Sequence, residues 1–132
     1  GVERVGAVQR ELVASSWGSP KDFSTWDSPL VAEMAFGARR AELRTVAEAA
    51  REGAANTNAL ERAARELLAL QSSDWAFQVT RDLAGDYPLR RVAGHRAAHD
   101  AAIGALADSG AVPDPALRNL APDLDLAALL AP

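Results

Sequence analysis

The chain has 132 residues, of which 30 are alanine, 13 arginine, one lysine and none cysteine, and its net charge at pH 7 is −4. This length fits one domain, and the acidic balance argues against a nucleic-acid partner. The missing cysteines exclude a disulfide framework and thiolate metal sites and fit a cytoplasmic protein. No apolar run approaches the length of about 18 residues that a membrane-spanning helix needs, so we expect no membrane partner. Because alanine has the highest helix propensity and buries little area, the composition predicts an all-α fold of closely packed helices.

The first 14 residues are ambiguous, because four apolar residues lie at helical steps but the beginning could also complete a strand. The chain starts at Gly1 rather than at a methionine, which suggests a piece of something longer. Residues 15–29 are rich in serine, glycine, proline and aspartate, and they predict a structured loop.

Start and stop signals predict three main helices. A serine and proline pair would begin the first, over residues 30–52, which ends before Gly53. Asn58, followed three residues later by Glu61, resembles a capping box and would open a second helix that continues to about Arg81.

The third main helix is expected over residues 86–108, and it contains two glycines. Gly94 and Gly104 each cost roughly 1 kcal/mol relative to alanine in an exposed helix, so we expect them to be tolerable if another helix packs closely there. Two short C-terminal helices, over 115–120 and 124–130, complete the expected bundle.

The apolar stripe of the second predicted helix becomes polar in its second half. At roughly 100° per residue, Gln71, Asp74 and Gln78 continue the stripe that leucines begin, and Trp75 flanks it. Either this helix emerges from the core and its end is hydrated, or the polar side chains face a cavity or a partner.

Two tryptophans of the loop, Trp17 and Trp26, allow a similar pair of interpretations. They would either anchor the loop onto the helices or present flat surfaces to a ligand, since the C–H face of a pyranose ring packs well on an indole.

His95 and His99 are four residues apart, a spacing that lets two imidazoles share a metal ion. Arg96 stands where the metalloprotease pattern has its glutamate, and a third ligand is not obvious. Hydrogen bonds to neighbouring helices are therefore the favoured role of the two histidines, and we expect no metal and no other cofactor.

Several motifs together resemble one family. They are Ser16-Trp17-Gly18 with a second tryptophan nine residues after the first, the run 64–68, the stretch Gln71-Ser72-Ser73-Asp74-Trp75-Ala76-Phe77, and Tyr87, Arg91 and His95 at steps of four. This pattern resembles the C-terminal helical domain of 1,4-alpha-glucan branching enzymes of the family-57 glycoside hydrolase type. The residues at 16–22 resemble actinobacterial members of the family most.

The resemblance implies a retaining transfer of an α-1,4-glucan segment to a 6-hydroxyl group. In the family, a glutamate nucleophile and an aspartate general acid perform this reaction on a barrel that precedes the helical domain. No position of this chain matches that pair, so we expect no catalytic residue here and no activity of the chain alone.

The resemblance also assigns roles along the chain. Residues 1–14 would be the tail of the barrel or a connector, 15–29 the tryptophan-bearing loop, and 30–132 a helical domain packed on the missing barrel. Its expected substrate-binding residues are Trp17, Trp26, Gln71, Asp74 and Trp75, forming one wall of the cleft for an alpha-glucan. The alternative is a free-standing helical protein-interaction module without catalysis.

Overall fold

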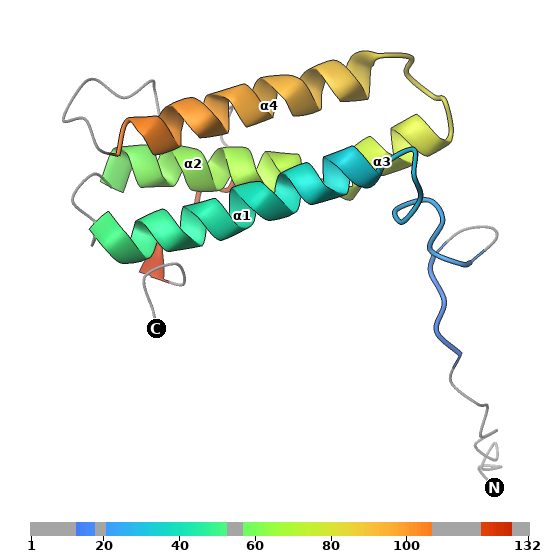
Figure 1. Ribbon diagram of the computed structural model, residues 1–132, viewed down its shortest axis with the longest axis horizontal. Helices are drawn as coiled ribbons and strands as arrows, with labels where there is room; N and C mark the ends of the chain where they lie inside the picture. The colour runs from blue at the N-terminus through green and yellow to red at the C-terminus, as the bar shows by residue number, and fades with distance from the viewer. Residues whose placement is uncertain (1–12, 18–20, 53–56, 107–119, 128–132) are drawn as a thin grey trace, which may run out of the picture.

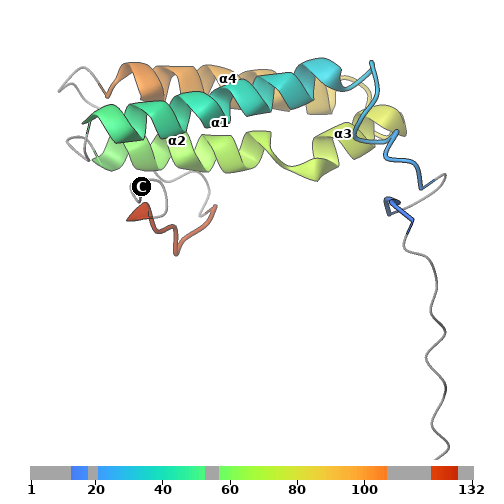
Figure 2. The same cartoon turned by 60° about the horizontal axis from the view of Figure 1, so that its bottom comes forward.

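The computed structural model describes residues 13–17, 21–52, 57–106 and 120–127. Within these ranges the chain forms four helices and no strand: α1 (Ala32–Glu52), α2 (Thr57–Leu70), α3 (Ser73–Thr80) and α4 (Tyr87–Gly104). The three long helices lie side by side, with α2 antiparallel to α1 and α4, and α3 lies at one end of the bundle (Figures 1 and 2). The expected all-α fold is therefore confirmed for the described residues.

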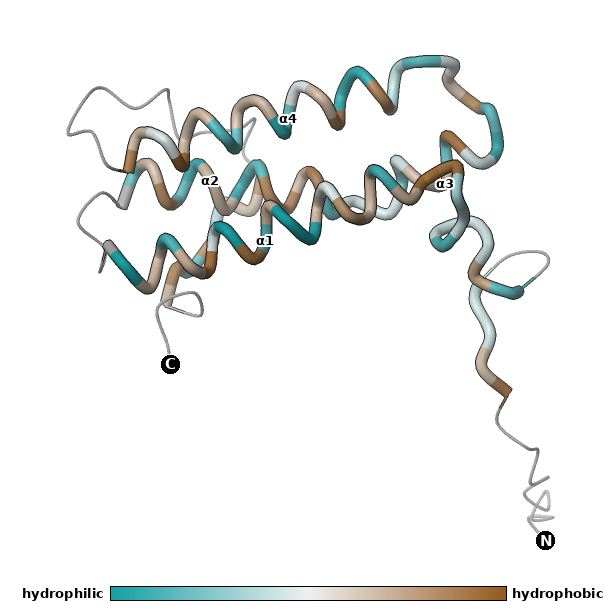
Figure 3. The backbone as a smooth tube through the Cα atoms, in the orientation of Figure 1, coloured by the Kyte–Doolittle hydropathy of each residue, from teal (hydrophilic) through white to brown (hydrophobic). Residues whose placement is uncertain are grey.

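Small side chains form much of the core. Its larger cluster contains Ala49 of α1, three residues of α2 and three residues at the end of α4 and just after it; these six are Ala59, Leu60, Ala63, Ala102, Ile103 and Leu106. Because alanine side chains are short, the helix backbones approach each other closely. Figure 3 shows hydrophobic and hydrophilic residues alternating along α1, as expected for a helix with one buried and one exposed side.

The second predicted helix is wrong in one respect, because the structure divides residues 58–81 into α2 and α3. Ser72 adopts an extended conformation (φ −60°, ψ 123°) and serves as the N-cap residue of α3. The indole Nε1 of Trp75 donates a hydrogen bond of 2.6 Å to the Ala69 carbonyl, and this bond satisfies an acceptor in the last turn of α2. A helical count carried past Leu70 therefore fails, and the polar residues after it do not continue the buried stripe of α2.

The other predicted boundaries agree more closely with the structure. Helix α1 covers nearly the whole of the predicted range 30–52, and α4 occupies most of 86–108. A Cβ atom at Gly94 or Gly104 would meet nothing within 4 Å, so no described residue packs closely on these glycines and the condition under which they were expected to be tolerable is not met.

The C-terminal part is only partly covered by the structure. The predicted helix 115–120 lies outside the described residues except for Leu120, and of 124–130 only 124–127 are described, where Leu124 donates a backbone bond to Ala121 in a turn. The Arg65 guanidinium donates to the carbonyls of Leu120 and Ala121 and so holds this segment against α2.

None of the described helices combines the length and the apolar character that crossing a membrane requires.

Candidate functional site

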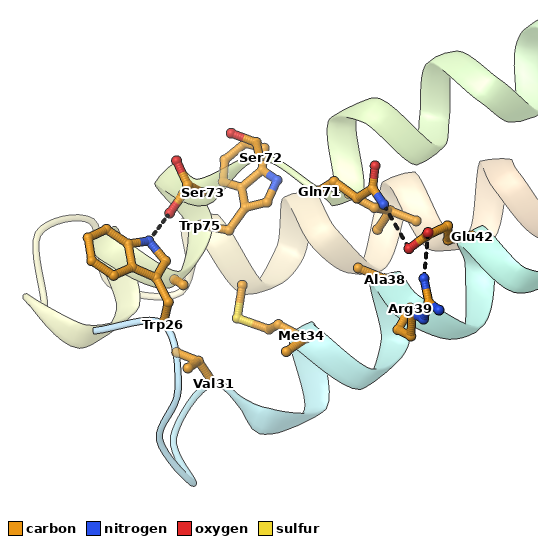
Figure 4. Close-up of a pocket in the computed structure, with 13 residues that line it drawn as sticks. Trp26, Val31, Met34, Ala38, Arg39, Glu42, Gln71, Ser72, Ser73 and Trp75 are labelled. Carbon is orange, nitrogen blue, oxygen red and sulfur yellow. Dashed lines mark hydrogen bonds and ion pairs between the residues drawn. The ribbon is translucent and has the colours of Figure 1, made fainter. Parts of the chain in front are cut away.

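A cavity of about 380 Å³ lies where the helix break separates α2 from α3 (Figure 4). One side is formed by the first three turns of α1, the opposite side by the α2–α3 junction, and one end by the loop before α1. Its lining residues are Trp26, Val31, Met34, Ala35, Ala38, Arg39, Glu42, Leu70, Gln71, Ser72, Ser73, Trp75 and Ala76. The cavity thus has an apolar floor and a few polar groups at its edge, the usual character of a small-molecule site.

Trp26 stands at one end of the cavity and is held in place by the α3 segment. Its indole Nε1 donates to the Ser73 carbonyl at 3.3 Å (Figure 4). The hydroxyl of Thr80 donates to the carbonyl of the buried Thr25 at 2.9 Å, which ties the loop to α3 directly before the tryptophan. Since these two bonds join the loop to the same helix, the ring is oriented before any ligand arrives.

The loop itself is tightly turned. Lys21 and Phe23 have φ angles of 70° and 67°, a left-handed conformation that residues with a side chain rarely adopt. Asp22 accepts a backbone bond of 3.0 Å from Ser24, and hydrogen bonds from Ser24 lower the pKa of the Asp22 carboxyl group below its ordinary value. Polar bonds within the loop therefore stabilise a conformation that its backbone would otherwise disfavour.

The other end of the cavity is polar. Glu42 accepts one bond from Arg39 at 2.5 Å and one from the Gln71 side-chain amide at 3.3 Å (Figure 4). The Gln71 carbonyl oxygen and the Arg39 guanidinium add further hydrogen-bonding capacity at this edge. A ligand with several hydroxyl groups would find both donors and acceptors here.

Trp75 lines the cavity and also packs on α4. Its ring centroid lies 6.3 Å from that of Tyr87 and 6.1 Å from that of His95, the second pair with an interplanar angle of 33°. With its Nε1 bonded to Ala69, the indole is fixed on several sides. The position of this wall therefore depends on the residues that hold His95.

A buried polar network holds His95. Its Nδ1 lies 2.7 Å from Oε2 of Glu66, and the Arg91 guanidinium lies 3.2 Å from its Nε2. Because a carboxylate only accepts and a guanidinium only donates, the ring carries its proton on Nδ1 and accepts at Nε2. Arg62 donates to the other Glu66 oxygen at 2.6 Å, and Glu66 is only 1% exposed.

His99 has a different partner. Its Nε2 lies 2.8 Å from the Thr45 hydroxyl oxygen, which in turn lies 2.9 Å from the Ala41 carbonyl. The single hydroxyl proton goes to the carbonyl, so His99 donates from Nε2, and its buried Nδ1 has no hydrogen-bond partner among the described residues. Burial lowers the pKa of His99 below its ordinary value.

The two histidines therefore bond to separate partners, as the favoured interpretation expected. Within the described ranges, no group of three potential ligands could hold a metal ion.

The structure brings together some of the predicted site residues but not all. Trp26, Gln71 and Trp75 line the cavity, whereas Trp17 and Asp74 do not. Trp17 is 76% exposed and contacts Phe77 at a centroid distance of 6.0 Å, and Asp74 is exposed in the first turn of α3.

The sequence pattern did not indicate the other residues that line the cavity. Arg39 and Glu42 lie three residues apart on α1, a spacing typical of a solvated helix face, and Met34 fits an ordinary apolar stripe. No signal in the sequence separates these roles, because the cavity depends on the helix break more than 25 residues further along the chain.

Comparison with known proteins gives consistent matches. Residues 37–125 match the family model described as the C-terminal part of 1,4-alpha-glucan branching enzyme. The chain is 39% identical over 88 residues to a 1,4-alpha-glucan branching enzyme of Thermococcus kodakarensis, a match covering 64% of this chain and 13% of that protein. It is 36% identical over 106 residues to probable 1,4-alpha-glucan branching enzymes of two Mycobacterium tuberculosis strains, covering 74% of this chain and 20% of each relative. The matched part is thus a fifth or less of these relatives. No solved structure matches the chain.

Proposed function

The chain belongs to the family of C-terminal domains of 1,4-alpha-glucan branching enzymes, and we propose that it forms one wall of a glucan-binding cleft. The opposite wall would be a catalytic barrel of the family-57 glycoside hydrolase type, outside this chain and in the same cytoplasmic enzyme. The reaction would be the retaining transfer of an α-1,4-glucan segment to a 6-hydroxyl group, performed by two carboxyl groups of the barrel. We assign no catalytic residue to the chain itself.

The convergence of Trp26, Gln71 and Trp75 on one cavity carries this proposal. Two indoles give faces on which the C–H groups of a glucosyl unit can pack. Gln71, together with Arg39 and Glu42 at the same edge, supplies donors and acceptors for its hydroxyl groups. An apolar wall with a polar edge is the surface that a sugar ring requires.

The chemistry of transfer explains why such a wall matters. A glycosyl intermediate reacts with a glucan rather than with water only when an acceptor is held nearby and water is excluded. An indole oriented in advance, as Trp26 is by Ser73, does both at little entropic cost.

Trp17 and Asp74 enter the proposal as outer contacts. Both are exposed near α3 in the described part of the chain. In the whole enzyme we expect Trp17 to stack on a glucosyl unit further from the cavity and Asp74 to face the catalytic centre.

The test uses the full-length enzyme that contains this chain, with amylose as the substrate. New α-1,6 linkages measure transfer, and new reducing ends without new branches measure hydrolysis. We expect Trp26→Ala to lower the ratio of transfer to hydrolysis roughly tenfold, the loss that about 1.4 kcal/mol of acceptor binding produces. Trp26→Phe should retain most of the ratio, because a smaller aromatic face remains.

Phe36→Ala is the matched control, since Phe36 is an aromatic residue of α1 that is 62% exposed and does not line the cavity. If Trp26→Ala lowers the melting temperature but leaves the ratio unchanged per folded molecule, Trp26 only anchors the loop and the proposal fails.

A further inference from the structure

A second hollow lies on the other flank of α1, where this helix packs on α4. It has a volume of about 260 Å³ and is lined by Gly37, Arg40, Ala41, Arg44, Arg96 and Asp100. We call it the arginine cleft. Three of its six lining residues are arginines, in a chain whose net charge is −4.

The cleft contains more positive than negative charge. Its one carboxylate, Asp100, is already engaged by Arg44 at 2.8 Å. Arg40 and Arg96 are exposed, and neither forms an ion pair with any residue that the structure describes. Two guanidinium groups that form no ion pair within the described part of the chain therefore line one small space, and a bound anion would supply the missing partner charge.

The guanidinium of Arg96 lies over Gly37 of α1. A Cβ atom at this buried position would lie 3.6 Å from Arg96 Nη1, an ordinary van der Waals distance, so the approach is close without requiring a glycine. Arg40 follows Gly37 by three residues on α1, and Asp100 follows Arg96 by four on α4, so the charged groups extend from facing turns of the two helices. The space between them is large enough for a small ion and too small for a folded partner.

We propose that the arginine cleft binds a phosphate dianion, either as the free ion or as a phosphate monoester, between the guanidinium groups of Arg40 and Arg96. Guanidinium donors form a planar fork that matches two oxygens of a phosphate group. The Asp100 carboxylate, which is paired with Arg44, repels anions, so the phosphate would contact the cleft at Arg40 and Arg96. The cleft does not share a lining residue with the glucan cavity, so this proposal does not rest on the proposed function.

The experiment is isothermal titration calorimetry of the chain with inorganic phosphate and, separately, with methyl phosphate, at constant ionic strength set with chloride. We expect saturable binding of both compounds. Tighter binding of methyl phosphate would identify an ester as the natural source, and tighter binding of inorganic phosphate would identify the free ion. Arg40→Gln and Arg96→Gln should each weaken the binding roughly tenfold, because each removes charge-assisted hydrogen bonds. Neither residue supports another described side chain by an ion pair, so both variants should fold.

Arg90→Gln is the control, because Arg90 lies on α4 outside the cleft and is equally charged. Equal weakening by Arg90→Gln would show only a general effect of net charge and would overturn the proposal. Failure of both phosphate compounds to give saturable binding to the unmodified chain would overturn it as well.

Discussion

Removal of the charge of Glu66 is the sharpest test of how the cavity wall is held. Glu66 is 1% exposed and accepts hydrogen bonds from Arg62 and from Nδ1 of His95. Glu66→Gln retains the shape of the side chain but replaces one acceptor oxygen with an NH₂ donor. One side of the amide must then face a donor, either Arg62 or His95.

The network cannot easily adapt to this change. If the amide NH₂ faces His95, the ring must move its proton to Nε2, and that proton then points at the guanidinium of Arg91, 3.2 Å away. One buried contact between two donors remains in every arrangement. Such a contact costs about 1–3 kcal/mol, and the loss of the carboxylate partner of the partly buried Arg62 adds to it.

We therefore expect Glu66→Gln to lower the free energy of unfolding by about 3 kcal/mol, which corresponds to roughly 10 °C in melting temperature for a chain of this size. Urea denaturation followed by circular dichroism measures the change. Glu48→Gln, in the exposed pair with Arg51, is the matched control and should change stability by about 0.5 kcal/mol or less. A cost below about 1 kcal/mol for Glu66→Gln would refute the proton assignment and the tight burial on which the reasoning depends.

Three further outcomes are expected. Gly94→Ala should stabilise the chain by about 1 kcal/mol, because a Cβ atom there meets nothing within 4 Å, and a loss of stability in the same urea assay would show that a backbone constraint or another surface acts there. The pKa of His99 is lowered in the folded state, so below about pH 6.5 the unfolded chain binds more protons than the folded chain. The free energy of unfolding should therefore decrease as pH falls, by up to about 1.4 kcal/mol per pH unit. His99→Gln, which keeps a donor for Thr45, should reduce this slope, and an unchanged slope would contradict the assignment. Thr80→Val removes the hydrogen bond to the Thr25 carbonyl and should speed amide hydrogen exchange in residues 23–27 while α2 and α4 retain their protection; unchanged exchange in residues 23–27 would show that this bond does not hold the loop.

The local signals along the chain predicted the helical framework well. Ser28 and Pro29 before the alanine-rich segment, and Gly53 after it, predicted where α1 begins and ends to within a few residues. This was possible because capping and helix propensity act over only a few positions. The same reasoning located α4 and identified the loop that carries Trp26.

The helix break after Leu70 could not be predicted in this way. Ser72 is compatible with a helix interior at modest cost. The indole of Trp75, which donates to the Ala69 carbonyl, is also packed against Tyr87 and His95 of α4, and the local sequence does not show these contacts. The polar residues that follow the apolar stripe of α2 are explained by the end of α2 at Leu70 and the start of α3 at Ser73, and not by a polar face on one continuous helix.

Helix propensity, capping and chain reversal depend on neighbouring residues, so the order of amino acids was enough to predict a bundle of closely packed helices with a tryptophan-bearing loop and the motifs of its family. Packing between distant segments fixes three other properties: which of the five predicted contact residues share a cavity, which nitrogen of each histidine carries the proton, and which arginines line one cleft without an ion pair. Those properties arise from contacts between residues 29 to 56 positions apart, such as Gln71 with Glu42 and Arg44 with Asp100, and such contacts leave no periodic trace in a single chain.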